Sequence, residues 1–116
     1  MRESLLASRT PPTLRLNKME RIIVKVSADF LELSRNYLLK RISELGTLND
    51  ALAGSRFDEI RAMSHKTKGT AASYGLKHLG ELARDLEQHS KNRDTTRARA
   101  VLDEMKTHLE SVEIVA

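Results

Sequence analysis

The 116-residue chain has no cysteine and no tryptophan, and it has only two phenylalanines and two tyrosines. Without thiols there can be no disulfide bonds, thiolate zinc sites or cysteine nucleophiles. So few aromatic rings also leave little on which nucleic-acid bases could stack. The 20 basic residues are offset by 16 acidic ones, which is typical of a solvated helical surface. We therefore expect no nucleic-acid partner.

Long apolar runs are also missing from the sequence. No segment approaches the roughly 20 apolar residues that span a bilayer, and the N-terminus lacks the apolar core of a signal peptide. The five glycines form no nucleotide-binding loop, so we expect the chain to have no kinase activity of its own. The sequence predicts a single cytoplasmic domain that binds no membrane.

The first 20 residues differ from the rest of the chain. They contain Pro11-Pro12, scattered arginines and no sustained periodicity, so we predict a flexible basic tail over residues 1–20 and a folded domain over 21–116. Met19 could be the natural start. Residues 21–26 are β-branched and extended in character. Because no second strand pattern accompanies them, we predict an arm against the helices rather than part of a sheet.

Apolar residues recur at spacings of three and four through most of residues 34–112, as in amphipathic helices. The predicted helices cover residues 34–53, 56–74, 76–92 and 95–112. A short helical turn is expected at 28–33, and Gly46 interrupts the first long helix without ending it. Four helices with short connections favour an all-α fold, an antiparallel up-down-up-down four-helix bundle with a short N-terminal helix or arm.

His65 lies in the second predicted helix. At 100° per residue, apolar Ile60 and Met63 fall on the opposite side, so we expect His65 to be exposed and to face away from the core. Side chains on its own face, with Lys66 at the flank, are candidates for contact with a partner. Their cations would favour an anion or an acidic partner. These candidates are Arg61, Ala62, Lys66, Lys68, Gly69 and Ala72.

Gly69 lies one turn from His65 on the same predicted face. Glycine costs a helix about 1 kcal/mol relative to alanine, so its presence calls for a reason. With Ala62 and Ala72 it would keep the surface low, and a partner could then approach closely. The alternative is that Gly69 permits close packing between helices.

Glu87 is the predicted neighbour of His65 on the next helix. If residues 75–76 form the turn of a helical hairpin, both side chains lie about 16 Å from that turn. Glu87 could then accept a hydrogen bond from Nδ1–H of His65, which would leave Nε2 free as a nucleophile. The alternative is an ordinary surface pair of Glu87 with Lys91. Arg84, about a turn from Glu87, could shape the rim of the site.

The other histidines give no sign of a metal site. His78, His89 and His108 form no His-x-x-x-His or Glu-x-x-His pair, the spacings that would place two ligands on one helix face. We therefore expect that the chain binds no metal.

The run His65-Lys66-Thr67-Lys68-Gly69, followed by small residues and Tyr74-Gly75-Leu76, resembles the histidine-containing phosphotransfer (HPt) domain. The resemblance covers residues 22–112 and implies a four-helix bundle that carries phosphoryl groups and is not an enzyme. It implies that His65 is phosphorylated, that Lys68 assists the phosphoryl group, that Gly69 leaves room for the partner and that Glu87 hydrogen-bonds the imidazole. Thr67 departs from the larger aliphatic residue usual in the family.

The resemblance also implies the partners. They are receiver domains of response regulators, whose aspartate gives or takes the phosphoryl group, and a hybrid sensor histidine kinase. Magnesium would belong to the receiver, so we expect no cofactor on this chain, and the chemistry needs only a monomer. The alternative function is a helical docking module that binds a receiver or a histidine kinase without being phosphorylated.

Overall fold

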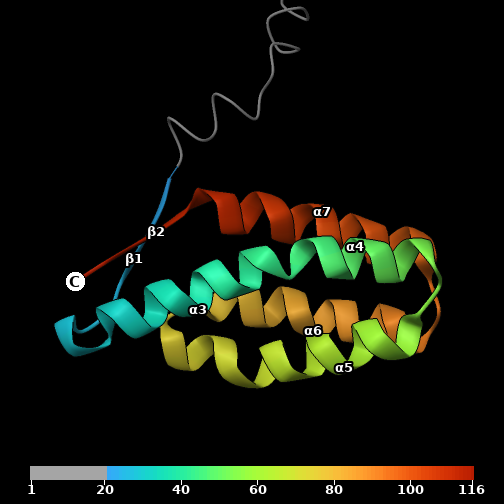
Figure 1. Ribbon diagram of the computed structural model, residues 1–116, viewed down its shortest axis with the longest axis horizontal. Coiled ribbons are helices and arrows are strands. Elements are labelled where there is room, and N and C mark those ends of the chain that lie inside the picture. Colours follow the sequence, from blue (N-terminus) through green and yellow to red (C-terminus); the bar gives the residue numbers. More distant parts are fainter. Residues whose placement is uncertain (1–20) are drawn as a thin grey trace, which may run out of the picture.

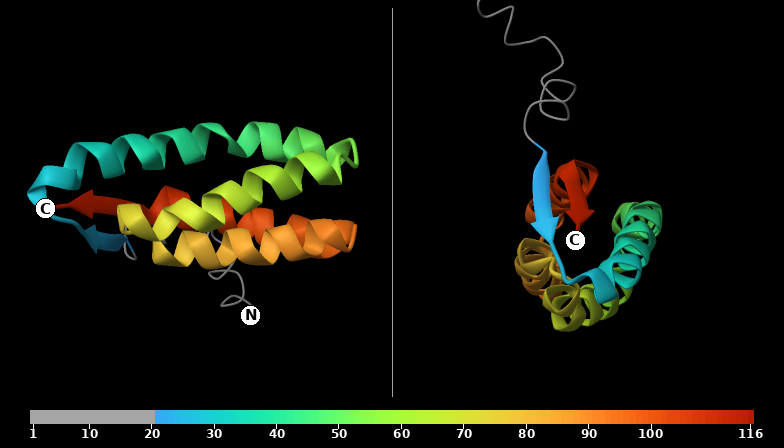
Figure 2. Two further views of the ribbon diagram at one scale, coloured as in Figure 1. Left: turned by 90° about the horizontal axis from the view of Figure 1, so that it is seen from below. Right: turned by 90° about the vertical axis from the view of Figure 1, so that its left-hand side faces the viewer.

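Four helical rods lie side by side in residues 21–116, the part of the chain that the structure, a computed structural model, describes (Figure 1). The predicted tail and Met19 lie outside the described residues. One rod combines α3 (Leu31–Ser43) with α4 (Leu45–Ala53). The others are α5 (Phe57–Thr70), α6 (Lys77–Lys91) and α7 (Thr95–Ser111). The chain turns back at each connection between rods (Figure 2).

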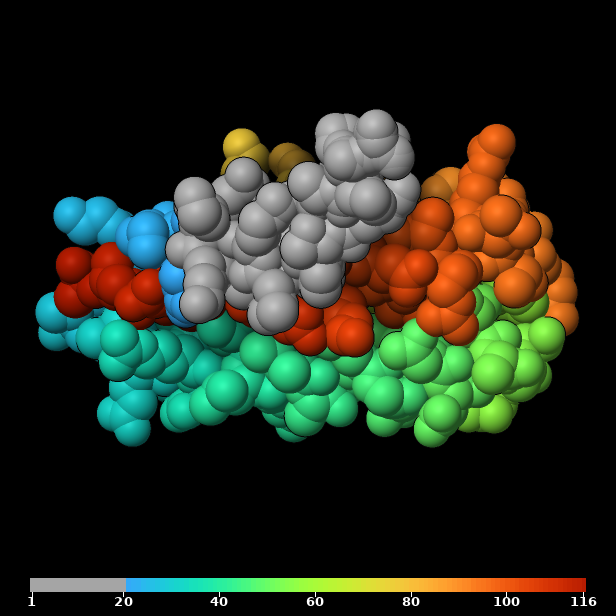
Figure 3. All heavy atoms as spheres, turned by 90° about the horizontal axis from the view of Figure 1, so that it is seen from above, coloured from blue at the N-terminus to red at the C-terminus, as the bar shows by residue number. Residues whose placement is uncertain are grey.

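The core lies between the rods and is built from the apolar stripes that the sequence predicts. This confirms the mainly helical bundle, because each stripe is buried against a neighbouring helix. Figure 3 shows α7 alongside the α3–α4 rod, and Arg99 of α7 hydrogen-bonds Asn49 of α4 there. The buried stripe residues include Leu38, Leu45, Leu48, Leu52, Leu76, Leu79, Ala83, Leu86, Ala98, Val101, Leu102, Met105 and Leu109.

The first rod differs from its predicted bounds. A 3-10 helix, η1 (Ala28–Phe30), leads directly into α3, which begins three residues before the predicted start. The break between α3 and α4 falls at Glu44 rather than at Gly46. There the backbone amide of Glu44 is shared between the carbonyls of Lys40 and Arg41, a tighter turn than that of an α-helix.

The second rod also ends earlier than predicted. α5 stops at Thr70 and gives way to a 3-10 helix, η2 (Ala71–Tyr74). In this tighter turn Tyr74 stacks on Tyr37 of α3, with ring centroids 4.2 Å apart. The Tyr37 hydroxyl also lies 2.7 Å from Oγ1 of Thr70. These contacts tie α3 to the end of α5, which the local periodicity of the sequence does not encode.

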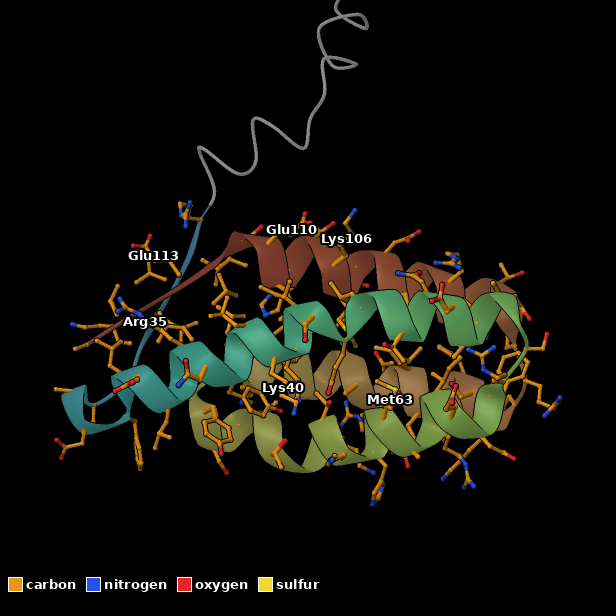
Figure 4. The ribbon with its side chains drawn as sticks, viewed as in Figure 1. Arg35, Lys40, Met63, Lys106, Glu110 and Glu113 are labelled. Carbon is orange, nitrogen blue, oxygen red and sulfur yellow. The ribbon has the colours of Figure 1, made fainter. Side chains whose placement is uncertain are left out.

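The prediction of an arm outside any sheet is wrong. β1 (Ile22–Lys25) pairs in parallel with β2 (Val112–Val115), Ile22 opposite Val112 and Lys25 opposite Val115. Because Val112 also continues the apolar stripe of α7, the sequence shows no separate strand there. Arg35 of α3 points toward the strands (Figure 4) and donates to the carbonyl of Ile114, with Nη2 3.1 Å away.

Gly75 closes the turn between η2 and α6, with φ of +86°. That left-handed conformation suits glycine. A Cβ at this position would also lie 2.9 Å from Cγ1 of Val26 and 3.1 Å from Cγ1 of Val24. The α5–α6 turn is therefore held directly against β1 and the residue that follows it.

His108 is a buried titratable group on the core side of α7, with 8% of its surface exposed. Its Nε2 has no hydrogen-bond partner within the described residues, and its ring packs edge-on against His78 at 4.7 Å. Burial, with a smaller contribution from the charge of His78, lowers the pKa of His108 to about 4 from 6.5. The folded protein thus holds His108 neutral.

This predicts a loss of stability in mild acid. Between pH 6.5 and about 4 the unfolded chain binds a proton at His108 that the folded chain does not, so the free energy of unfolding falls as pH falls. The expected loss is on the order of 2–3 kcal/mol. Urea unfolding at pH 7, 5.5 and 4.5 measures it.

His108→Phe, with His108→Leu as a second variant in case the ring fits poorly, should remove most of this pH dependence. His89→Gln, at a half-buried position on α6, is the control and should retain it. Equal pH dependence in the wild type and in both His108 variants would contradict the prediction.

Candidate functional site

His65 is exposed on the outer face of α5, as the helical pattern predicts. Its side chain is 68% exposed, while Ile60, Ser64 and Thr67 on the opposite side are buried. The Ser64 hydroxyl is satisfied by the carbonyl of Ile60 at 2.7 Å. The apolar and small residues of the inner face therefore orient α5 so that His65 faces outward.

Glu87 of α6 lies beside His65 and is almost fully buried, with 9% of its side chain exposed. One carboxylate oxygen, Oε2, is 2.9 Å from Nδ1 of His65. The other, Oε1, is 2.8 Å from Nζ of Lys68. The predicted contact between His65 and Glu87 is thus present. The alternative, a surface pair of Glu87 with Lys91, is not found among residues 21–116.

The contact with Glu87 fixes which nitrogen of His65 carries the proton. An ionised carboxylate only accepts hydrogen bonds, so Nδ1 of His65 must donate. In the neutral ring this leaves Nε2 without a hydrogen, with its lone pair available. An exposed nitrogen nucleophile backed by a buried carboxylate can take an electrophile and keep the resulting cation paired.

The carboxylate of Glu87 is held in its ionised form. Its hydrogen bond with Lys68 is the largest influence and lowers its pKa below the ordinary 4.5. Burial raises the pKa, because it disfavours the charged form. The hydrogen bonds from Lys68 and His65 and the positive charges of these two residues together outweigh burial, so the net shift is downward. At neutral pH the site therefore contains a buried anion between α5 and α6.

A shallow hollow of about 460 Å³ opens beside the imidazole. Its lining residues are Arg61, Ala62, His65, Glu87 and Lys91. Four of these five were predicted from the sequence as site residues. Lys91 was not, although its place four residues after Glu87 puts it on the same face of α6, one turn further along.

The remaining predicted residues do not line this hollow. Gly69 is exposed, and a Cβ built on it would have no neighbour within 4 Å, which excludes the alternative of close helix packing. Lys66 and Arg84 are exposed on α5 and α6. Ala72 is exposed too, but it belongs to η2, so its predicted α-helical position relative to His65 does not hold.

Two other kinds of site, a metal centre and a membrane-spanning helix, are not found in residues 21–116. Across residues 21–116, His, Asp and Glu side chains do not gather in threes that could hold a metal ion. In that range there is also no helix with the length and apolar character needed to cross a bilayer.

The ionised state of Glu87 predicts a second pH effect on stability. A carboxyl with a lowered folded-state pKa contributes stability above its ordinary value near 4.5 and loses it as pH falls through the lowered value. Glu87→Gln should therefore be destabilised relative to wild type at pH 6, and this difference should shrink toward pH 3. Chemical unfolding at both pH values measures it.

Glu81→Gln is the matched control, because Glu81 is also on α6 but its side chain is 48% exposed. Exposed ion pairs contribute little to stability, so this variant should follow wild type at both pH values. If the difference in unfolding free energy between wild type and Glu87→Gln stayed constant from pH 6 to pH 3, Glu87 would not be an ionised carboxylate with a lowered pKa.

Comparison with known protein families gives one result that covers most of the chain. The family model described as "Hpt domain" matches residues 26–114, a range that includes every residue of the site. No curated protein and no solved structure matches the chain. Hpt domains are phosphocarriers of two-component signalling, not kinases. The match covers well over half of the sequence, and the chain therefore belongs to the Hpt domain family.

Proposed function

We propose that this protein is a phosphorelay intermediate in which His65 accepts a phosphoryl group from the aspartate of one receiver domain and passes it to another. The observation that carries the proposal is the hydrogen bond between Nδ1 of His65 and buried Glu87. It leaves Nε2 as the free nitrogen on a side chain that is 68% exposed. A hybrid sensor histidine kinase would supply the first receiver.

The transfer needs no acid or base from this chain. Nε2 of neutral His65 attacks the phosphorus of the aspartyl phosphate, and an N–P bond forms as the P–O bond breaks. The P–O electron pair leaves on the aspartate carboxylate. The imidazole becomes a cation that keeps its Nδ1–H on Glu87. Transfer onward reverses these steps, with the electron pair of the N–P bond returning to Nε2. Positioning and charge stabilisation supply the catalysis.

The surface around His65 supports close approach by a partner. Ala62 has only a methyl group and Gly69 has no side chain, so neither would hold a receiver away from the imidazole. Nothing in residues 21–116 lies within 4 Å of the Cβ position of Gly69. Lys66, Ala72 and Arg84 are exposed and available for contact. Cations favour a partner with an acidic site, because complementary charge speeds association.

The other parts of the proposal follow from the family. The working unit is the domain of residues 21–116, with the antiparallel up-down-up-down order of helices, acting as a monomer. Lys68 stabilises the charge of the site. Magnesium is required on the receiver, where the aspartyl phosphate forms, and not on this chain.

The first test is phosphoryl transfer from a panel of phosphorylated receiver domains. Wild-type protein should acquire acid-labile, base-stable label, and His65→Gln should acquire none while its circular dichroism stays helical. His89→Gln is the matched control and should label normally. Label on His65→Gln would refute the assignment of the nucleophile. A receiver that binds the wild type without ever labelling it would favour the docking module.

A second prediction concerns Gly69. Gly69→Ala should stabilise the fold by about 0.5–1 kcal/mol, because alanine is the better helix former and meets no neighbour. Gly69→Leu should fold as well as wild type but transfer phosphoryl groups from a receiver at least tenfold more slowly, since its side chain would stand between the partner and His65. Thermal unfolding and transfer rates measure the two effects.

Gly46 offers a matched control, since it is an exposed glycine of α4 with nothing within 4 Å of its Cβ position. Gly46→Ala and Gly46→Leu should change stability in the same direction and leave transfer at the wild-type rate. Full transfer by Gly69→Leu would show that the receiver does not approach across this turn of α5.

A further inference from the structure

The hollow beside His65 contains two cations that are not paired within residues 21–116. Arg61 and Lys91 line it from α5 and α6, and neither takes part in the ion pairs found in that range. Arg61 precedes His65 by four residues and Lys91 follows Glu87 by four. Each is therefore one helical turn, about 6 Å, from the pair that forms the site.

The charged side chains at the hollow, counted together with Lys68, carry a net positive charge. Glu87 contributes one negative charge, and Lys68 offsets it through the 2.8 Å contact between Nζ and Oε1. With His65 neutral, Arg61 and Lys91 remain as two positive charges without a counterion among the described side chains. A phosphoryl group carries a charge of about −1.5 to −2 near neutral pH, which these two cations match.

Lys68 is poorly placed to be the main contact of the phosphoryl group. Its ammonium group is bound to Glu87, and Lys68 does not line the hollow. Moving it to an anion on Nε2 would leave the buried Glu87 carboxylate with His65 as its only partner. Breaking a buried ion pair in this way is costly. Lys68 therefore acts as a positioning residue, through Glu87.

We propose that Arg61 and Lys91 form the anion-binding site of this protein and hold the oxygens of the phosphoryl group when it is on Nε2 of His65. This deepens the proposed function and rests on it for the phosphorylated form. Ala62 also lines the hollow with only a methyl group, and the hollow of about 460 Å³ leaves room for a phosphate-sized group beside the ring. Arginine supplies a planar pair of donors, and lysine supplies a mobile point charge.

The first experiment tests the anion site without any phosphorelay chemistry. Inorganic phosphate is titrated into the unphosphorylated protein, and amide shifts of Ala62 and His65 are followed by ¹H–¹⁵N NMR. Wild type should show saturable shifts. Arg61→Gln and Lys91→Gln should each weaken binding roughly three- to tenfold, and the double variant should abolish it. Both residues are exposed, so these variants should fold.

Lys66→Gln is the matched control, because Lys66 is an exposed lysine next to His65 in sequence that does not line the hollow. It should bind phosphate as wild type does. Equal binding by wild type and the Arg61→Gln/Lys91→Gln double variant, or a greater loss in Lys66→Gln than in either single variant, would overturn the proposal.

The second experiment uses the phosphorylated protein. Phosphoramidate supplies the phosphoryl group directly: an N–P bond forms at Nε2 of His65 as the P–N bond of the donor breaks, and ammonia leaves with the electron pair. A ³¹P NMR titration then gives the pKa of the bound phosphoryl group. Nearby cations favour its dianion, so Arg61→Gln and Lys91→Gln should raise this pKa. Lys66→Gln should leave it unchanged, and Lys68→Gln should raise it less.

The outcomes separate the two proposals. A protein that is labelled on His65 but shows the same phosphoryl pKa in wild type, Arg61→Gln and Lys91→Gln would overturn the anion site and leave the phosphorelay function intact. A larger rise of the phosphoryl pKa in Lys68→Gln than in both Arg61→Gln and Lys91→Gln would show that Lys68 is the main phosphoryl contact and not a positioning residue. A protein that phosphoramidate fails to label would count against the phosphorelay function, and the inorganic phosphate titration would still decide the anion site.

Discussion

The carboxylate of Glu87 is the group on which the rest of the site depends. It is buried at the contact of α5 with α6, and its two oxygens are bound by His65 at 2.9 Å and by Lys68 at 2.8 Å. A buried carboxylate is tolerated only when such partners replace its hydration. The same two contacts fix the tautomer of His65, hold Lys68 away from the hollow and require α5 and α6 to meet at one register.

That register is fixed by packing at the end of the bundle nearest the turn. Gly75 reverses the chain between η2 and α6, and the valines of the N-terminal segment pack against it. Further along, a Cβ on Gly80 would lie 3.6 Å from Cβ of Ala71 and 3.8 Å from the Lys68 carbonyl, so small residues let the two helices approach closely. The parallel pairing of β1 with β2 connects this turn to the end of α7. Elements far from His65 thus determine where Glu87 lies.

The outer face of α5 shows a different use of small residues. At Gly75 the backbone conformation and the neighbouring valines both require glycine, whereas Gly69 is required by nothing in the described residues. The proposed function accounts for a glycine that costs helix stability without serving the fold, because the proposed receiver must come close to His65. Arg61 and Lys91, which form no ion pair within residues 21–116, fit the proposed anion site, because a surface that binds an anion keeps its positive charges uncompensated until the anion arrives.

The sequence by itself determined the helical rods, the outward orientation of His65 and the match of His65 with Glu87, because these follow from helical periodicity and from counting residues away from one turn. Tertiary structure alone decided three features. β2 forms because residues 22–25 lie beside it, about 90 positions away in the chain. α5 gives way to η2 where Tyr74 stacks on Tyr37. Lys68 joins Glu87 while Lys91 faces the hollow. Each depends on contacts between segments that are distant in sequence. The local periodicity and spacing of residues do not determine which distant groups come into contact.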